Sequence, residues 1–121
     1  MKNLKFKNTF ALSSDDIYQS VELLKKQGVK LLHTPDSYYQ TINQRLPDHG
    51  ENIKQLQENR ILIDGNPQKN QGLLLQIFTD TVIGPIFFEI IQRKGNEGFG
   101  EGNFQALFEA IELDQMKRGV I

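Results

Sequence analysis

Two apolar runs dominate the second half of the sequence: Ile86-Phe87-Phe88-Glu89-Ile90-Ile91-Gln92-Arg93 and, just before it, Gly72-Leu73-Leu74-Leu75-Gln76-Ile77-Phe78-Thr79. Both runs are rich in branched apolar and aromatic residues, which favours strands. In each run, apolar residues occupy both alternating sets of positions, so both faces of these strands need cover. We expect helices on one face, and a second sheet, a second subunit or a ligand on the other.

Upstream of these strands, the sequence predicts a strand and then a helix. Lys5 to Leu12 alternates apolar and polar residues with the period of a half-buried strand. Ser13 to Asp16 supplies N-cap oxygens, and Ile17, Val21 and Leu24 recur on one side of the helix that follows. This pattern is typical of an amphipathic helix that packs on a sheet.

The middle of the chain is less regular. Val29 to Leu32 predicts a second strand, which Pro35 stops. Two short helices are expected on either side of Pro47-Asp48-His49-Gly50, and Ile61 to Ile63 predicts another strand. A glycine-rich loop over residues 95–102 precedes the last predicted element.

That last element is a helix. Asn103 is expected to cap it, and its amphipathic pattern comes from Phe104, Leu107, Phe108 and Ile111. The expected order is β-α-β, a helical insert, β-β-β and a final helix. We therefore expect an α+β fold in one domain over residues 1–121.

Composition and charge exclude several classes of function. The chain has 121 residues, 14 Lys+Arg, 15 Asp+Glu, a net charge of -1 and no cysteine. This balance gives no basic footprint for nucleic acid, and no apolar run is long enough to cross a bilayer. The absence of cysteine removes thiol catalysis and thiolate metal sites. We expect a cytoplasmic protein without a nucleic-acid or membrane partner, and the two apolar sheet faces predict a homo-oligomer, with a dimer as the simplest case.

Two polar residues interrupt the apolar strands. Glu89 has Phe87 and Ile91 as its same-face neighbours, so on a closed face it needs a metal ion, a basic partner or a raised pKa. On an open face it would instead be solvated beside Arg93. Gln76 is a similar signal: it is either a hydrogen-bonded sheet residue or a substrate contact.

The glycine-rich loop does not match a phosphate-binding motif. Its glycines do not follow G-x-G-x-x-G, and acidic Glu97 and Glu101 would repel phosphate. The loop is either a mobile lid that carries Phe99 and Phe104 or a plain connection. The two histidines, His33 and His49, are expected at the surface.

Three segments together closely resemble the C-terminal segment of 4-hydroxyphenylpyruvate dioxygenases, and they cover residues 72–79, 87–93 and 98–111. The resemblance implies a vicinal-oxygen-chelate fold, in which βαβββ modules pair and curl around a non-haem Fe(II). This chain resembles one such module with a helical insert and a C-terminal helix, the C-terminal half of the family's domain. The family reaction uses O2 to convert 4-hydroxyphenylpyruvate, an aromatic 2-oxo acid, to homogentisate.

The same resemblance implies roles for six residues. Glu89 matches the carboxylate that ligates iron beside two histidines, a donor set known for Fe(II) oxygenases. Five further side chains match positions in or beside the family's catalytic pocket: Gln76, Phe78, Phe99, Asn103 and Phe104.

One departure from the family pattern bears on metal binding. Alignment on Ala11-Leu12 places Asn8 and Thr9 where the family has Gln-His, and that histidine ligates iron. The other histidine ligand belongs to the preceding module of the family. We therefore expect that this chain alone binds no stoichiometric Fe(II) and is inactive. The alternative is a non-catalytic module that binds an aromatic acid or a protein partner.

Overall fold

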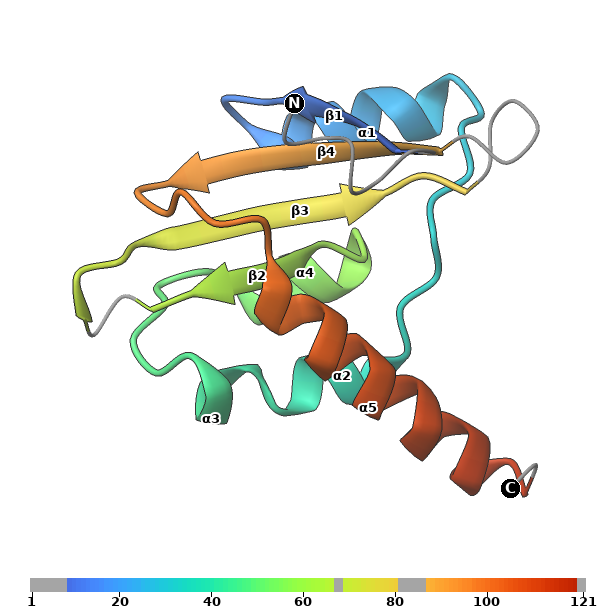
Figure 1. Cartoon of the computed structure of the whole chain (residues 1–121). Coiled ribbons are helices and arrows are strands. Elements are labelled where there is room, and N and C mark those ends of the chain that lie inside the picture. The colour runs from blue at the N-terminus through green and yellow to red at the C-terminus, as the bar shows by residue number, and fades with distance from the viewer. Residues whose placement is uncertain (1–8, 67–68, 81–86, 120–121) are drawn as a thin grey trace.

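The computed structural model describes residues 9–66, 69–80 and 87–119. Its centre is a mixed sheet with the strand order β1-β4-β3-β2 (Figure 1). β1 pairs in parallel with β4, while β3 pairs antiparallel with both β4 and β2. The strands are β1 (Thr9–Ser13), β2 (Leu62–Gly65), β3 (Leu73–Phe78) and β4 (Phe87–Lys94).

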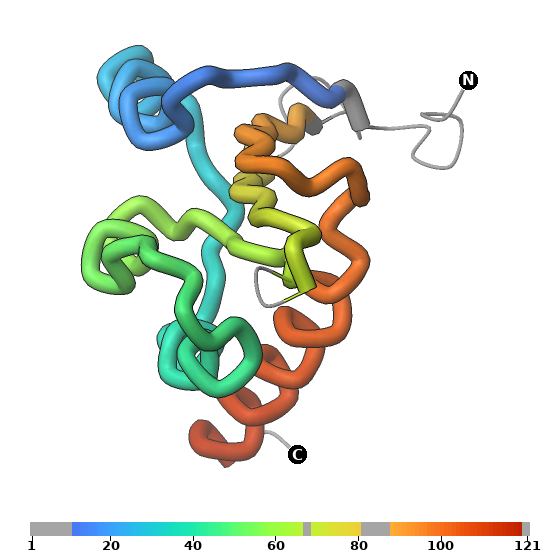
Figure 2. The backbone as a smooth tube through the Cα atoms, turned by 90° about the vertical axis from the view of Figure 1, so that its left-hand side faces the viewer, coloured from blue at the N-terminus to red at the C-terminus, as the bar shows by residue number. Residues whose placement is uncertain are grey.

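Helices cover the sheet unequally. Figure 2, which views the sheet along its edge, shows α1 and α4 on one side, whereas α5 starts on the other side and runs past the β2 edge. We call the side covered by α1 and α4 the helix face and the opposite side the site face. The helices are α1 (Ile17–Lys26), α2 (Asp36–Gln40), α3 (Ile42–Arg45), α4 (Ile53–Glu58) and α5 (Glu101–Lys117). No helix in the described ranges is long and apolar enough to cross a bilayer.

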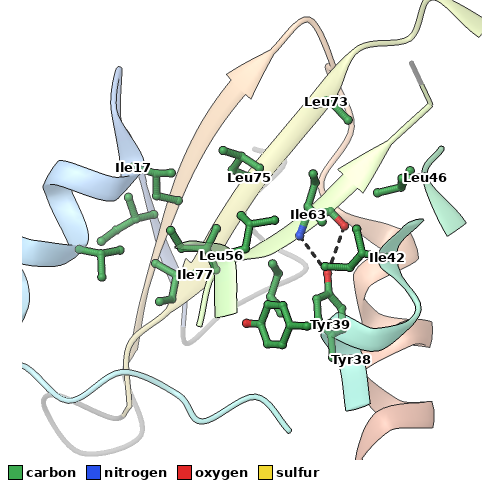
Figure 3. Packing of buried hydrophobic residues seen from close by; sticks show 14 of the residues in the cluster. Ile17, Tyr38, Tyr39, Ile42, Leu46, Leu56, Ile63, Leu73, Leu75 and Ile77 are labelled. Carbon is green, nitrogen blue, oxygen red and sulfur yellow. Dashed lines mark hydrogen bonds between the residues drawn. The ribbon is translucent and has the colours of Figure 1, made fainter. Parts of the chain in front are cut away.

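The main hydrophobic core lies on the helix face (Figure 3). Leu75 and Ile77 of β3 point into it and meet Ile17 and Val21 of α1 and Leu56 of α4; each of these is at most 1% exposed. The start of α1 is fixed as predicted, because the side chain of Asp16 accepts a hydrogen bond from the backbone N–H of Gln19. The alternation of β3 thus directs one set of side chains into this core and the other set to the site face.

The two central strands confirm the sequence prediction to within about a residue, but the predicted strand over 29–32 does not form. Leu31 makes only an isolated bridge to Thr79, beside a hydrogen bond from the Leu32 N–H to the Phe78 carbonyl. The chain leaves this pairing at Pro35 and enters α2. Of the first predicted strand, residues 5–8 lie outside the described residues and the rest falls in β1.

The last helix differs from its prediction in two ways. Gly100, with a left-handed φ of 77°, is the N-cap of α5, so Asn103 lies inside the helix and does not cap it. The predicted apolar side is also only partly buried: Leu107 packs against the core, whereas Phe104 and Phe108 are 47% and 63% exposed. The buried residue Ala110 lies against α2, and Ser37 of α2 donates a hydrogen bond to its carbonyl.

The core assignment predicts a contrast between two leucines. Leu75→Ala should lower the free energy of unfolding by about 3 kcal/mol, because it leaves a cavity in a fully buried site. Leu12→Ala, in a strand but at a side chain 51% exposed, should change it by less than about 0.5 kcal/mol. Urea unfolding of both variants checks this, and equal losses would contradict the core assignment.

Candidate functional site

The site face brings Glu89, Gln76 and Phe78 together. Glu89 of β4 is paired with Phe78 of β3, and Gln76 Nε2 donates a 2.5 Å hydrogen bond to Glu89 Oε2. Gln76 is fully buried, and Glu89 is only 9% exposed. The structure therefore confirms that these three residues share one face, and it excludes the solvated-face interpretation of Glu89.

The carboxyl group of Glu89 is in an unusual electrostatic environment. Burial raises its pKa, which the Gln76 N–H and the positive charge of Arg93 partly oppose. Within the described residues Glu89 makes no ion pair. Arg93 instead donates to the carbonyls of Asn96 and Gly98 in the loop before α5. The carboxyl is thus held by an amide and not by a salt bridge.

The start of α5 closes over Gln76. Asn103 Nδ2 donates a 2.7 Å hydrogen bond to Gln76 Oε1. A Cβ atom at Gly100 would lie 1.8 Å from the same oxygen, so only glycine permits this approach, and its positive φ also favours glycine. The ring of Phe104 lies 6.5 Å from that of Phe78. These contacts place Asn103 and Phe104 beside the strand residues Gln76 and Phe78.

Phe99 lies farther out. It is 40% exposed, and the guanidinium of Arg93 lies 5.7 Å from its ring centroid. Its loop is tied down locally: Asn96 Nδ2 donates to the Gln71 carbonyl, and the Phe99 N–H donates to Glu101 Oε1. The loop therefore has a defined hydrogen-bonded conformation. In it, Phe99 lies against Arg93, whose positive charge in turn acts on Glu89.

Sequence reasoning missed Tyr38 and Arg45. The hydroxyl of Tyr38 donates to Asn103 Oδ1, and Arg45 Nη2 donates to the Tyr38 oxygen. These residues lie in the helical insert, far along the chain from β3 and β4, and no motif spacing connects them. The available signal is chemical: a buried tyrosine hydroxyl needs a partner.

The described residues do not fit a complete Fe(II) site. They contain no group of three His, Cys, Asp or Glu that could hold a metal ion. Thr9, the residue that we align with a histidine of the family, is paired with Phe87 in the strand beside Glu89. In the part of the chain that the structure describes, Glu89 therefore has no cluster of metal-ligating side chains around it.

Both histidines lie outside the strands that carry Gln76 and Glu89. The prediction that His49 lies at the surface is wrong, because it is 9% exposed: its Nε2 bonds with Asn43 Oδ1, and its Nδ1 accepts from the Glu51 N–H. Both ring nitrogens are therefore used within the insert. His33 is exposed, as predicted.

Comparisons with known proteins agree with the geometry. No protein-family model matches the chain. It is 63% identical over 111 residues to a 4-hydroxyphenylpyruvate dioxygenase of Legionella pneumophila, which covers 92% of this chain and 32% of that protein. It is 64% identical to the enzyme of the same name from Pseudomonas aeruginosa, over 92% of this chain and 31% of that protein. The chain spans about a third of the length of these relatives.

A solved structure supports the same relationship. A mutant of 4-hydroxymandelate synthase from Streptomyces coelicolor superposes with a TM-score of 0.70 and 37% identity, over 89% of this chain and 30% of that protein. The mixed sheet and its helices are those of a vicinal-oxygen-chelate module. In sequence and in fold, the chain therefore corresponds to a C-terminal segment of the 4-hydroxyphenylpyruvate dioxygenase family.

Proposed function

We propose that this chain forms one wall of an active site of the 4-hydroxyphenylpyruvate dioxygenase type, as the C-terminal half of a vicinal-oxygen-chelate domain. The observation that carries the proposal is a buried carboxylate, Glu89, held by the amide of Gln76 and next to Phe78. In relatives 63% and 64% identical, this segment belongs to proteins named for that reaction. The proposed setting is tyrosine catabolism in the cytoplasm.

The chemistry of the wall suits an aromatic 2-oxo acid. Phe78 and Phe104 offer ring surfaces against which an aromatic substrate can pack. Gln76 and Asn103 hold polar groups in fixed positions among apolar neighbours, so they can orient a ligand without admitting bulk water. Glu89 is the side chain that we assign as an iron ligand.

The donor count limits what the chain can do alone. A facial triad needs three protein donors; the described residues contain no group of three such side chains, and Glu89 is the one donor that we match to the family. We therefore propose that the isolated chain neither holds stoichiometric Fe(II) nor turns over 4-hydroxyphenylpyruvate, and no catalytic step is assigned to it.

A gain-of-ligand variant tests the donor count. The unmodified chain, supplied with Fe(II) and 4-hydroxyphenylpyruvate, should show no oxygen uptake and no homogentisate. Thr9→His adds an imidazole on the strand beside Glu89, so the affinity for Co(II), measured by calorimetry, should rise about tenfold or more. The double variant Thr9→His with Glu89→Gln is the control and should lose this gain. Substrate-dependent oxygen uptake by the unmodified chain would contradict the proposal.

The raised pKa of Glu89 predicts a pH dependence of stability. The folded state binds this proton more tightly than the unfolded state, so Glu89 lowers stability progressively as the pH rises from its ordinary pKa of 4.5 through its higher folded pKa. Glu89→Gln removes this ionisation. Its free energy of unfolding, relative to the unmodified metal-free chain, should increase between about pH 4.5 and about pH 7. Urea unfolding at both pH values measures this, and a constant difference would show that burial does not disfavour the carboxylate.

A second candidate function is a non-catalytic module that binds an aromatic acid or a protein partner. The observation in its favour is the side of α5 that begins beside Phe78 and carries Phe104 and Phe108, which are 47% and 63% exposed. Exposed aromatic residues at this density are typical of surfaces that meet another molecule. A second copy of the chain would be the simplest partner.

Self-association is therefore an expected outcome for the isolated chain. Light scattering in the micromolar range should give a mass of about twice 13.9 kDa. Phe108→Ser, at a side chain 63% exposed, should shift the mass toward that of the monomer without a loss of helical content. A strictly monomeric mass for the unmodified chain would exclude the dimer.

A further inference from the structure

A continuous series of hydrogen bonds connects the helical insert to the site face. Arg45 Nη2 lies 3.0 Å from the Tyr38 oxygen, the Tyr38 hydroxyl contacts Asn103 Oδ1, Asn103 Nδ2 lies 2.7 Å from Gln76 Oε1, and Gln76 Nε2 lies 2.5 Å from Glu89 Oε2. The five side chains come from α3, α2, α5, β3 and β4. The bonds therefore cross most of the fold and end at the carboxylate.

The direction of these bonds is fixed at Tyr38. Its oxygen receives the backbone N–H of Ile63 at 2.9 Å, which Figure 3 shows, and it also receives Arg45 Nη2. Both groups can only donate, and a hydroxyl oxygen has two lone pairs and one proton. The two lone pairs are therefore occupied, so the two remaining neighbours, Asn103 and the Ile63 carbonyl at 3.1 Å, must face the hydroxyl with acceptor atoms. The Ile63 carbonyl already accepts from Arg45 Nη2, and Asn103 Oδ1 is the nearer of the two acceptors, so we place the Tyr38 proton on the contact with Asn103.

The remaining orientations follow from that proton. Since Asn103 presents Oδ1 to Tyr38, its Nδ2 faces Gln76, and Gln76 has to accept through Oε1. The Gln76 Nε2 group is then the one that faces Glu89. Side-chain amide orientations are usually ambiguous, but here a backbone N–H and an arginine, neither of which can accept, determine both amides.

Burial makes a reversal of these amide groups energetically costly. Tyr38, Asn103 and Gln76 are at most 2% exposed, so water does not readily replace a lost partner. A reversed amide at Gln76 would set its oxygen against the Glu89 carboxylate in a site of low polarity, which is costly.

We propose that Tyr38 is a positioning residue, which acts through Asn103 to hold the Gln76 amide with its N–H toward Glu89. This arrangement favours the ionised carboxylate and ties one of its two oxygens to Gln76. The inference rests on the proposed function in one respect, namely the assignment of Glu89 as a metal ligand. The orientation of the amides is a property of the metal-free chain and can be measured separately.

The first test follows the Gln76 side-chain amide by NMR in the 15N-labelled chain. In the unmodified protein its Nε2 protons should be protected from exchange with water. Tyr38→Phe should accelerate this exchange roughly fivefold, as expected for the loss of one hydrogen bond that restrains the amide. Tyr39→Phe is the matched control, because Tyr39 is the adjacent buried tyrosine and its hydroxyl lies outside the series. It should leave the Gln76 exchange rate unchanged.

A double-mutant cycle separates positioning from general destabilisation. Asn103→Leu removes the connection between Tyr38 and Gln76, so this variant alone should also accelerate Gln76 exchange. Adding Tyr38→Phe to Asn103→Leu should then have no further effect on that rate. Should Tyr38→Phe fail to fold, the Asn103→Leu measurement still tests the connection.

Two results would overturn the inference. One is a Gln76 exchange rate that is the same in the unmodified chain and in the Asn103→Leu variant. The other is an effect of Tyr38→Phe of the same size in both backgrounds, which would show that Tyr38 acts through stability alone. Neither result depends on metal binding. Failure of Thr9→His to gain affinity for Co(II) would count against the proposed function and leave the positioning role standing.

Discussion

The backbone N–H and carbonyl of Ile63 face outward from β2, the last strand of the sheet, and polar backbone groups at a buried edge need partners. The hydroxyl of Tyr38 lies within 3.1 Å of both groups, and Arg45 donates a second bond to the same carbonyl. A short helical insert therefore completes the sheet edge. Without this pairing, the outer edge of β2 would carry unsatisfied backbone groups at Ile63.

This edge contact also determines where α5 can lie. Tyr38 and Asn103 are bonded to each other, and Asp64 at the end of β2 accepts from the N–H of Gly102. The first turn of α5 is consequently fastened to the strand edge at two points, while Gly100 gives it room to pass directly above Gln76. The same few side chains therefore satisfy the polar groups at the β2 edge and hold the first turn of α5 over Gln76.

Much of this could be predicted from the sequence, because it follows from local patterns. The strands that contain Gln76 and Glu89 alternate clearly, and Asp16 begins its helix as expected. Contacts between distant segments could not be predicted. The apolar pattern of α5 does not reveal that Phe108 is exposed, because the position of the helix depends on contacts from Ser37, Tyr38 and Asp64, and no periodicity within the helix encodes them.

The parallel pairing of β1 with β4 has a consequence for synthesis on the ribosome. β1 is synthesised well before β4, the strand with which it pairs. The hydrogen bond from the Ile17 N–H to Gln92 Oε1 likewise joins residues 75 positions apart. Closing so long a loop is entropically slow. During that interval the side of α1 that carries Ile17 and Val21 has no sheet to cover it, and exposed apolar surface of this kind makes a folding intermediate prone to aggregation.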